Sequence, residues 1–220
     1  MAARELHAVS TQEALVEALR DRILAGEFAP GSPLSDVALA SEYGVARPTL
    51  RAAVQSLVHD GLIRREPRRR AFVPRLTAQD IRDLYFVRLS LELAAVKAVV
   101  RRPEALEPAA RVVEQFERLG DDESWREAVD ADMAFHAALV AAAASPRLER
   151  TYGSLQSEIR LALVQLRPAY ATVSALAEEH RRVLEAIASG PQSAAERVMR
   201  EHLERAVADL TAVAPAPAIP

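Results

Sequence analysis

The sequence contains no cysteine, few aromatic residues and few glycines, and each scarcity narrows the kinds of protein it can encode. Without cysteine there are no disulfides, no thiolate metal ligands and no cysteine nucleophile. Aromatic residues make up only 5% of the chain and glycines number seven, whereas half of the residues are hydrophobic and alanine is abundant. This composition favours helices over sheets. The 220 residues have room for one large domain or two small ones with a buried core.

Long apolar runs are also missing. No stretch reaches the roughly 18 consecutive apolar residues that a membrane-spanning helix needs. The N-terminal sequence Met-Ala-Ala-Arg-Glu-Leu-His lacks the apolar centre of a secretion signal. We therefore expect no membrane partner and a cytoplasmic location.

The net charge of −3 conceals an uneven distribution. Residues 44–76 hold eight arginines against two acidic residues, a local net charge of +6, whereas the chain from Thr77 onward has a net charge of −5. One basic segment in an otherwise acidic chain suits a nucleic-acid partner for that segment alone. The alternative is an ordinary solvated charged surface.

Two short helices separated by a glycine are predicted within this region. Ser35 can cap a helix that runs through Tyr43, Gly44 supplies a turn, and a second helix is predicted over residues 47–59. Two helices joined by a tight glycine-containing turn form a helix-turn-helix unit, whose second helix enters the major groove of DNA. The segment therefore predicts a DNA-binding domain.

The flanking sequence completes that domain. Ser10, with Glu13 at the capping-box position, is predicted to cap a preceding helix that ends at Gly26. Residues 62–65 and 70–73 are predicted as two short strands of a hairpin, joined by a turn rich in arginine. We expect a winged helix-turn-helix domain over residues 10–75, preceded by a flexible arm of residues 1–9.

The predicted DNA contacts come from the second helix and the wing. Arg47 and Arg51 are four residues apart and share one helix face, from which an arginine can bind the O6 and N7 atoms of guanine. Thr49 lies near the helix start and can contact a base or a phosphate. The arginines at the hairpin tip are predicted to contact phosphates or the minor groove; they are Arg68, Arg69 and Arg70. The alternative for Arg47 and Arg51 is an ordinary exposed helix surface.

From Thr77 onward the pattern is wholly helical. Starts of helices are predicted at Thr77, Pro103, Asp121 or Asp122, Ser145-Pro146, Ser174 and Ser193. The fourth of these helices is expected to continue to about Arg167. About six helices with short connections indicate an antiparallel all-α bundle over residues 77–211. The tail, residues 212–220, is rich in proline and alanine and is predicted to be disordered.

Polar residues on three of these helices form a candidate metal site. Asp132 and His136 are spaced i, i+4 and can face one point, and His180 and His202 lie on the last two helices. Three imidazoles and one carboxylate suit a divalent transition metal such as Zn²⁺, Ni²⁺ or Mn²⁺. By spacing alone, ordinary core or surface histidines are the stronger alternative.

Residues 10–75 resemble the winged helix-turn-helix domain of the GntR family of bacterial repressors. The matching residues are Ile23, Gly26, Pro30, Gly31, Leu34, Leu39, Ala40, Gly44, Val45, Arg47, Pro48 or Thr49, Arg51, Leu57, Gly61, Leu62, Phe72 and Val73. Four positions depart from the family pattern, namely Ala46 for serine, Ala52 for glutamate, Val37 for arginine and Arg70 for glycine. These departures affect the DNA sequence that is recognised rather than the expectation of DNA binding.

The second part of the chain resembles the all-helical effector-binding domain of the FadR subfamily, the FCD domain. The residues that carry this resemblance are Arg88, Glu92, Asp132, Phe135, His136, Glu179, His180, Arg200, His202 and Leu203. The resemblance implies that Asp132, His136, His180 and His202 bind the metal. It also places Arg88 in the same cavity, where it can bind a carboxylate, the alternative being a salt bridge with Glu92. Arg160 is a weaker candidate for effector binding.

Together these patterns predict a transcriptional regulator and not an enzyme. We expect a homodimer, acting as a repressor, that binds a palindromic DNA operator and responds to a small carboxylate effector beside the metal. One alternative is a metal-dependent hydrolytic enzyme with a DNA-targeting domain. Another is a metal-free sensor of acyl ligands. The resemblance also implies a bacterial protein that lies on the nucleoid when it is bound to DNA.

Overall fold

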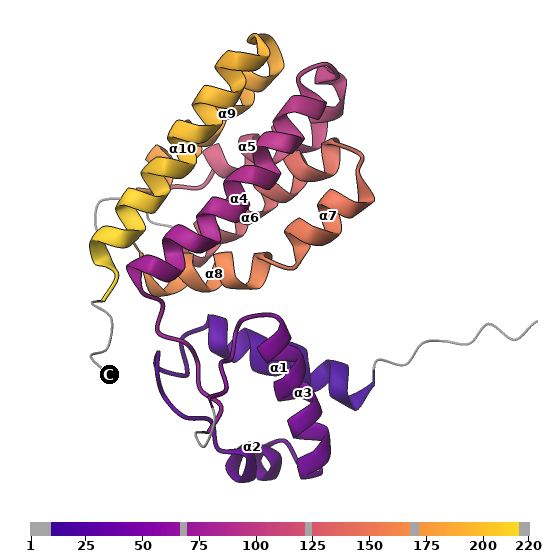
Figure 1. Ribbon diagram of the computed structural model, residues 1–220, viewed down its shortest axis with the longest axis vertical. Coiled ribbons are helices and arrows are strands. Elements are labelled where there is room, and N and C mark those ends of the chain that lie inside the picture. The colour runs from indigo at the N-terminus through magenta and orange to yellow at the C-terminus, as the bar shows by residue number, and fades with distance from the viewer. Residues whose placement is uncertain (1–9, 67–69, 122–124, 168–171, 216–220) are drawn as a thin grey trace, which may run out of the picture. The chain divides into compact units, whose positions relative to one another are not determined.

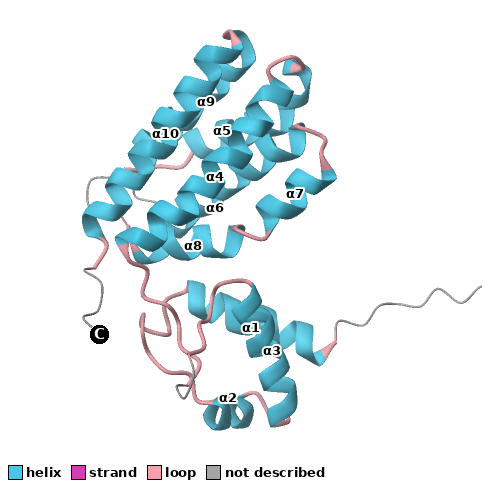
Figure 2. Ribbon diagram, in the orientation of Figure 1, coloured by secondary structure: helices cyan, strands magenta, loops and turns pink. Residues whose placement is uncertain are grey.

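The chain forms two compact helical units, Met1–Arg75 and Leu76–Pro220. The computed structural model describes residues 10–66, 70–121, 125–167 and 172–215. Helices form nearly all of the regular structure in these ranges (Figures 1 and 2). None of the helices there is long and apolar enough to cross a membrane. The predicted arm, residues 1–9, lies outside the described residues.

The first unit contains three helices, α1 (Thr11–Leu24), α2 (Asp36–Glu42) and α3 (Arg47–His59). Helices α1 and α2 both pack against α3. Their contact is apolar, since the core contains Leu15, Leu19, Ile23, Leu50 and Leu57, each almost completely buried. Helix α3 is therefore held from two sides by apolar burial, and its remaining face is left to solvent.

Local sequence signals set the helix ends. The Ser10 side chain accepts a hydrogen bond from Glu13 N, and Glu13 in turn accepts one from Ser10 N, so the predicted capping box is present. Gly44 has a φ of +63°, a backbone conformation that favours glycine, between α2 and α3. Ala46 stands at the N-cap of α3 and makes no side-chain cap.

The wing is shorter than predicted. Within the described residues it pairs only at isolated bridges, Arg64 with Phe72 and Pro33 with Phe72. The reason lies in the first predicted strand, because the amides of Leu62 and Ile63 both donate to Leu57 O at the end of α3. Those two donors are consequently absent from the hairpin ladder.

The second unit is all helical. Its helices are α4 (Ala78–Val99), η1 (Pro103–Leu106), α5 (Glu107–Glu117), α6 (Trp125–Ala142), α7 (Pro146–Gly153), α8 (Gln156–Gln165), α9 (Val173–Ser189) and α10 (Gln192–Val213). Helix α4 packs against α6 and α10, and α5 packs against α6 and α9. The predicted fold class, a winged helix-turn-helix followed by a helical unit, is confirmed.

Three predicted boundaries in this unit need correction. The fourth predicted helix is two helices, because α7 ends at Gly153, a poor helix former, and α8 begins at Gln156. The fifth begins at Val173 rather than Ser174, since Thr172 caps it by accepting from Ala175 N. The last helix extends to Val213, so the first two residues of the predicted tail are helical, and residues 216–220 lie outside the described ranges.

The interior of this unit is not purely apolar. Six charged or polar side chains are buried in it, namely Arg88, Glu92, Asp132, His136, His180 and His202. They come from α4, α6, α9 and α10. Buried ionisable groups are costly unless they are paired or bind an ion, so this cluster marks the candidate site of the unit.

Candidate functional site

Three buried histidines converge in the helical unit. His136 comes from α6, His180 from α9 and His202 from α10, and one nitrogen of each lies within 4.8 Å of the others. The Nε2 atoms of His136 and His202 are 3.3 Å apart. Two nitrogens that each lie about 2.1 Å from one ion have roughly this separation, so the spacing fits metal ligation.

The outer nitrogen of each ring faces an acceptor. His136 Nδ1 lies 2.6 Å from Glu92 Oε2, and His180 Nδ1 lies 2.7 Å from the carbonyl oxygen of Leu176. His202 Nδ1 lies 3.4 Å from Glu179 Oε2. Because these oxygens only accept, we assign the ring protons of His136 and His180 to Nδ1. Their Nε2 lone pairs then point into the cluster, as in metal-binding histidines.

Asp132 adds an oxygen to the cluster. Its Oδ1 atom lies 3.1 Å from His180 Nε2 and 3.9 Å from His136 Nε2. Its Oδ2 atom is buried and has no hydrogen-bond partner among the described residues. Burial alone would raise the pKa of Asp132, but the neighbouring His180, His136 and Arg88 outweigh it and lower the pKa below its ordinary value. The group is therefore a carboxylate.

His136 and His202 are neutral in this setting. Burial lowers the pKa of His136 to about 4, despite the opposing effect of Glu92, and burial also lowers the pKa of His202. For Glu92, burial is outweighed by His136 and Arg88, which lower its pKa to about 2. Neutral imidazoles beside carboxylates are the protonation states that metal binding requires.

These residues fit a divalent metal. With its Nδ1 proton directed to Leu176 O, His180 presents a lone pair to Asp132 Oδ1 only 3.1 Å away, so two acceptors face each other in a buried place. A cation between them would remove that repulsion. The set of three nitrogens and one oxygen suits zinc, nickel or manganese and does not select among them.

Arg88 lies next to Asp132 in the cluster and is only 1% exposed. Its Nε donates to Glu92 Oε1 at 2.8 Å and its Nη1 donates to the Tyr85 hydroxyl at 3.1 Å. Its Nη2 lies 3.8 Å from Asp132 Oδ2 and has no hydrogen-bond partner among the described residues. Arg88 therefore forms the salt bridge with Glu92 and still directs one donor group towards the cluster.

A cavity of about 170 Å³ lies next to these residues. Its lining residues are Tyr85, Arg88, Trp125, Asp132, Leu163, Ala175, Leu176, Glu179, His180, His202, Leu203, Arg205, Ala206, Asp209 and Leu210. Arg160, the other predicted effector residue, is absent from this lining and pairs with Asp130 instead. Its neighbours Ile159 and Leu161 are buried, and the helical rotation between successive residues turns Arg160 away from the core.

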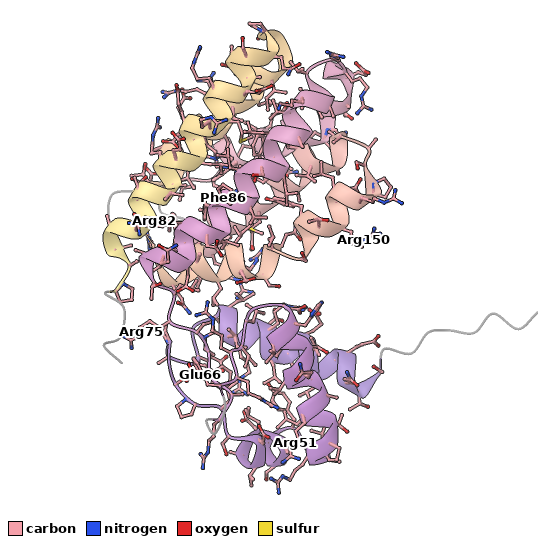
Figure 3. The ribbon with its side chains drawn as sticks, in the orientation of Figure 1. Arg51, Glu66, Arg75, Arg82, Phe86 and Arg150 are labelled. Atoms are coloured by element: carbon pink, nitrogen blue, oxygen red, sulfur yellow. The ribbon has the colours of Figure 1, made fainter. Side chains whose placement is uncertain are left out.

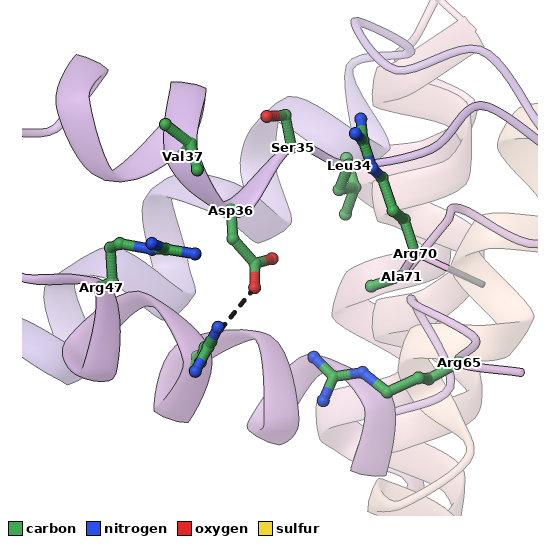
Figure 4. Close-up of a pocket in the computed structure, with 9 residues that line it drawn as sticks. Leu34, Ser35, Asp36, Val37, Arg47, Arg65, Arg70 and Ala71 are labelled. Carbon is green, nitrogen blue, oxygen red and sulfur yellow. Dashed lines mark hydrogen bonds and ion pairs between the residues drawn. The ribbon is translucent and has the colours of Figure 1, made fainter. Parts of the chain in front are cut away.

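The first unit carries a basic surface concavity of about 470 Å³. Arginines from α3 and the wing line it, namely Arg47, Arg51, Arg65 and Arg70 (Figure 4). Arg51, at 58% exposed, donates from Nε to Asp36 Oδ2 across 3.3 Å, as the dashed line in Figure 4 marks. An excess of exposed positive charge on one face suits contact with a phosphate backbone.

The structure thus groups three of the predicted DNA contacts, Arg47, Arg51 and Arg70. Thr49 is half-buried in the first turn of α3, and Arg68 and Arg69 lie outside the described residues. Sequence reasoning missed Asp36 and Arg65 in the concavity. Arg65 belongs to the arginine-rich hairpin sequence that signalled the wing, whereas no sequence signal pairs Asp36 with Arg51.

In the helical unit, sequence reasoning paired Glu92 with Arg88 but missed its contacts with His136 and Tyr152. The Tyr152 hydroxyl donates to Glu92 Oε1 at 3.2 Å. Sequence reasoning also missed Glu179 as the neighbour of His202 and Arg205. The Glu179-His180 pair was visible in the sequence, but the partners of Glu179 lie on another helix.

A helix-turn-helix unit beside a helical unit with a buried polar cavity defines a DNA-binding transcriptional regulator with an effector domain. The chain belongs to the family described as "Bacterial regulatory proteins, gntR family", whose model matches residues 11–73, and its second unit is an FCD domain, matched over residues 83–205. The matching families and relatives are regulators and not enzymes, which excludes the alternative of a hydrolytic enzyme.

Individual proteins agree with this assignment. The uncharacterized HTH-type transcriptional regulator BphR of Paraburkholderia xenovorans is 30% identical, with 89% of this chain and 83% of that protein covered. The gluconate operon transcriptional repressor of Bacillus subtilis is 28% identical over 84% of this chain and 79% of its own length. A GntR transcriptional regulator from Rhodococcus sp. RHA1 has a TM-score of 0.75 and 29% identity, covering 91% of this chain and 97% of that one.

Proposed function

We propose that this regulator senses a small carboxylic acid at a divalent metal held by Asp132, His136, His180 and His202. The observation that carries the proposal is the inward direction of the Nε2 atoms. The Nδ1 atoms of His136 and His180 are occupied by Glu92 and Leu176 O, so these rings offer only lone pairs to the centre of the cluster. Three imidazoles and a carboxylate around a buried point supply four metal ligands.

The metal and Arg88 would each bind one oxygen of the effector carboxylate. A divalent ion held by these four residues would bind one carboxylate oxygen by taking a coordination number above four. Arg88 presents its Nη2 group to the other oxygen, and its remaining donors stay on Glu92 and Tyr85, which hold the guanidinium in place. The apolar side of the cavity excludes water from this contact.

On the DNA side, we assign base contacts to Arg47 and Arg51 and phosphate contacts to Arg65 and Arg70. The same wing would extend these contacts through Arg68 and Arg69. Thr49, in the first turn of α3, would contact a base or a phosphate. A homodimer would place two such units on a palindromic operator, and an acid that binds two arrangements of the dimer with different affinity would change operator binding. We infer repression rather than activation because two relatives are named as repressors, the gluconate operon repressor of Bacillus subtilis and RspR of Escherichia coli.

The test is the metal content of the purified full-length protein, measured by elemental analysis. We expect about one transition metal per chain after incubation with Zn²⁺, Ni²⁺ and Mn²⁺ in parallel, and its loss in Asp132→Ala and His180→Ala. His59→Ala, which alters an exposed histidine of α3, is the matched control and should keep the metal. Equal metal content in wild type and His180→Ala would refute the ligand set, and a metal-free wild type would refute the metal.

A further inference from the structure

The lining of the cavity beside the histidines contains a polar and an apolar group of residues. The polar group, called the polar side below, includes Arg88, Asp132, His180 and His202 together with Tyr85, Glu179, Arg205 and Asp209. The apolar group, called the apolar side or wall below, is Trp125, Leu163, Ala175, Leu176, Leu203, Ala206 and Leu210. Such a division selects a ligand with one polar end and one apolar end.

The polar side has donors for a single anionic group. Arg88 Nη2 is the one nitrogen of that guanidinium without a hydrogen-bond partner among the described residues. Arg205, the other arginine in the lining, donates from Nη1 to Glu179 Oε1 at 2.6 Å, and Asp209 also lines the cavity. The charge of Arg205 is thus already balanced by Glu179, and a second carboxylate on the ligand would be repelled by Glu179 and Asp209.

The apolar side cannot satisfy hydroxyl groups. Trp125 has the one polar side-chain atom on this wall, and its Nε1–H already donates to Leu163 O at 2.8 Å. The indole therefore offers the cavity apolar ring surface, beside leucine and alanine side chains. A polyhydroxylated acid would leave its hydroxyl groups without partners on this wall, which lowers its affinity.

The volume limits the size of the apolar part. The cavity measures about 170 Å³. An apolar cavity of about 150 Å³ in a protein core holds one benzene molecule, so this one takes a body of about one aromatic ring. A long acyl chain exceeds this volume.

We infer that the effector is a monocarboxylic acid with a compact apolar body, an aromatic ring or a short branched chain, which lies between Trp125 and Leu176. This inference rests on the proposed carboxylate site and adds the class of acid that it accepts. The carboxylate binds at Arg88 and the histidine cluster, and the apolar body fills the space towards Leu163 and Leu210. Sugar acids, dicarboxylates and long fatty acids are poor ligands.

The test uses Zn²⁺-loaded full-length protein whose metal content is measured on the same sample. Because Trp125 is the only tryptophan in the sequence, its fluorescence reports directly on this wall. Four probes separate the classes, namely benzoate, gluconate, phthalate and decanoate. We expect benzoate to change the Trp125 emission and to bind at least about tenfold more tightly than the other three, by calorimetry.

Two variants locate the binding. Leu176→Asn places an amide on the apolar wall and should weaken benzoate binding by about tenfold or more. Leu89→Asn, a half-buried leucine of α4 outside this cavity, is the matched control and should leave binding unchanged. Gluconate or phthalate that binds as tightly as benzoate would overturn this inference while the carboxylate site stands. A sample that retains metal but binds none of the acids would overturn the carboxylate site together with it.

Discussion

Glu92 Oε2 lies 2.6 Å from His136 Nδ1, and both side chains are completely buried. Glu92 also accepts hydrogen bonds from Arg88 and Tyr152, so one carboxylate joins α4, α6 and α7. Through His136 it fixes the ring orientation and makes Nε2 a better electron donor. Glu92 is therefore a positioning residue for the proposed metal site rather than a ligand.

Glu92→Gln should weaken metal binding without removing any ligand. The amide keeps the size of the side chain but loses the charge that supports His136 and Arg88. We expect about a 10- to 100-fold loss of Zn²⁺ affinity, measured by competition with a chelator. Glu185→Gln, an exposed glutamate of α9, serves as the control. Zn²⁺ affinity equal to that of wild type would show that Glu92 has no role in positioning His136.

Arg88→Lys should separate acid binding from metal binding. Lysine keeps a positive charge near Glu92 but cannot contact Glu92, Tyr85 and a carboxylate at once with a planar fork. We expect benzoate affinity of the Zn²⁺-loaded protein to fall by roughly tenfold or more, whereas Zn²⁺ content stays at the wild-type level. Both are measured on one preparation. Loss of the metal in this variant would assign Arg88 to the metal site instead.

The ion pair of Arg51 and Asp36 predicts that loss of the Asp36 charge raises the general affinity for DNA and lowers the sequence specificity. Asp36 holds the guanidinium through Nε, which leaves the Nη groups for a base or phosphate. Asp36→Asn would loosen this hold and remove a negative charge from the basic concavity. We expect stronger binding to random duplex and a smaller ratio of specific to random binding, by fluorescence anisotropy.

The operator for this measurement comes from selection out of a random duplex library. Asp21→Asn removes an exposed carboxylate from α1 of the same unit and is the matched control. If both variants keep the wild-type specificity ratio, Asp36 does not position Arg51. If both increase random binding equally, the effect of Asp36 is only one of net charge.

The exposed apolar side chains provide a place to examine the proposed homodimer. Phe86 of α4 is 72% exposed and lies near Arg82 (Figure 3). Both residues line a shallow groove with Leu89 and Val207. Contiguous apolar patches mark contact surfaces, so this groove with Phe86 is a face at which substitutions can test the proposed dimer contact.

Sequence reasoning was most successful where a local rule determines the structure. The capping pairs Ser10 with Glu13 and Thr77 with Asp80 are read directly from their spacing, and both capping boxes form. The grouping of His136, His180 and His202 could not be predicted from local spacing, since these residues are far apart in the sequence. Residue type alone made them one of two alternatives, and the family resemblance favoured the metal site, because helix periodicity does not say which helices are neighbours.

The predictions for the wing strands and for Arg160 missed the same physical effect. In each case a polar group has a different hydrogen-bond or ion-pair partner from the one that the sequence suggested. The wing is short because the amides of Leu62 and Ile63 bind Leu57 O. Arg160 was a candidate for the cavity, but Asp130 on a neighbouring helix takes its guanidinium. Neither competing partner can be read from spacing along the chain, since the choice depends on tertiary contacts.

The buried histidines predict that the metal-free protein loses stability in mild acid. Burial lowers the pKa of His136 to about 4 in the folded state, whereas an unfolded histidine titrates near pH 6.5. Between these values the unfolded chain binds the extra proton, so the free energy of unfolding falls as the pH drops from 6.5 towards 4. The lowered pKa of Glu92, about 2, extends the loss to still lower pH in the same direction.

From pH 7.5 to pH 5 we expect His136 alone to remove about 2 kcal/mol of unfolding free energy, measured by urea denaturation of chelator-treated protein. His136→Gln cannot take up this proton, and its unfolding free energy should depend less on pH over the same range. His59→Gln should keep the wild-type dependence, since His59 is exposed on α3. Equal pH dependence in His136→Gln and wild type would mean that the folded protein accommodates a protonated His136. A charged imidazole at this position would argue against a site that binds a cation.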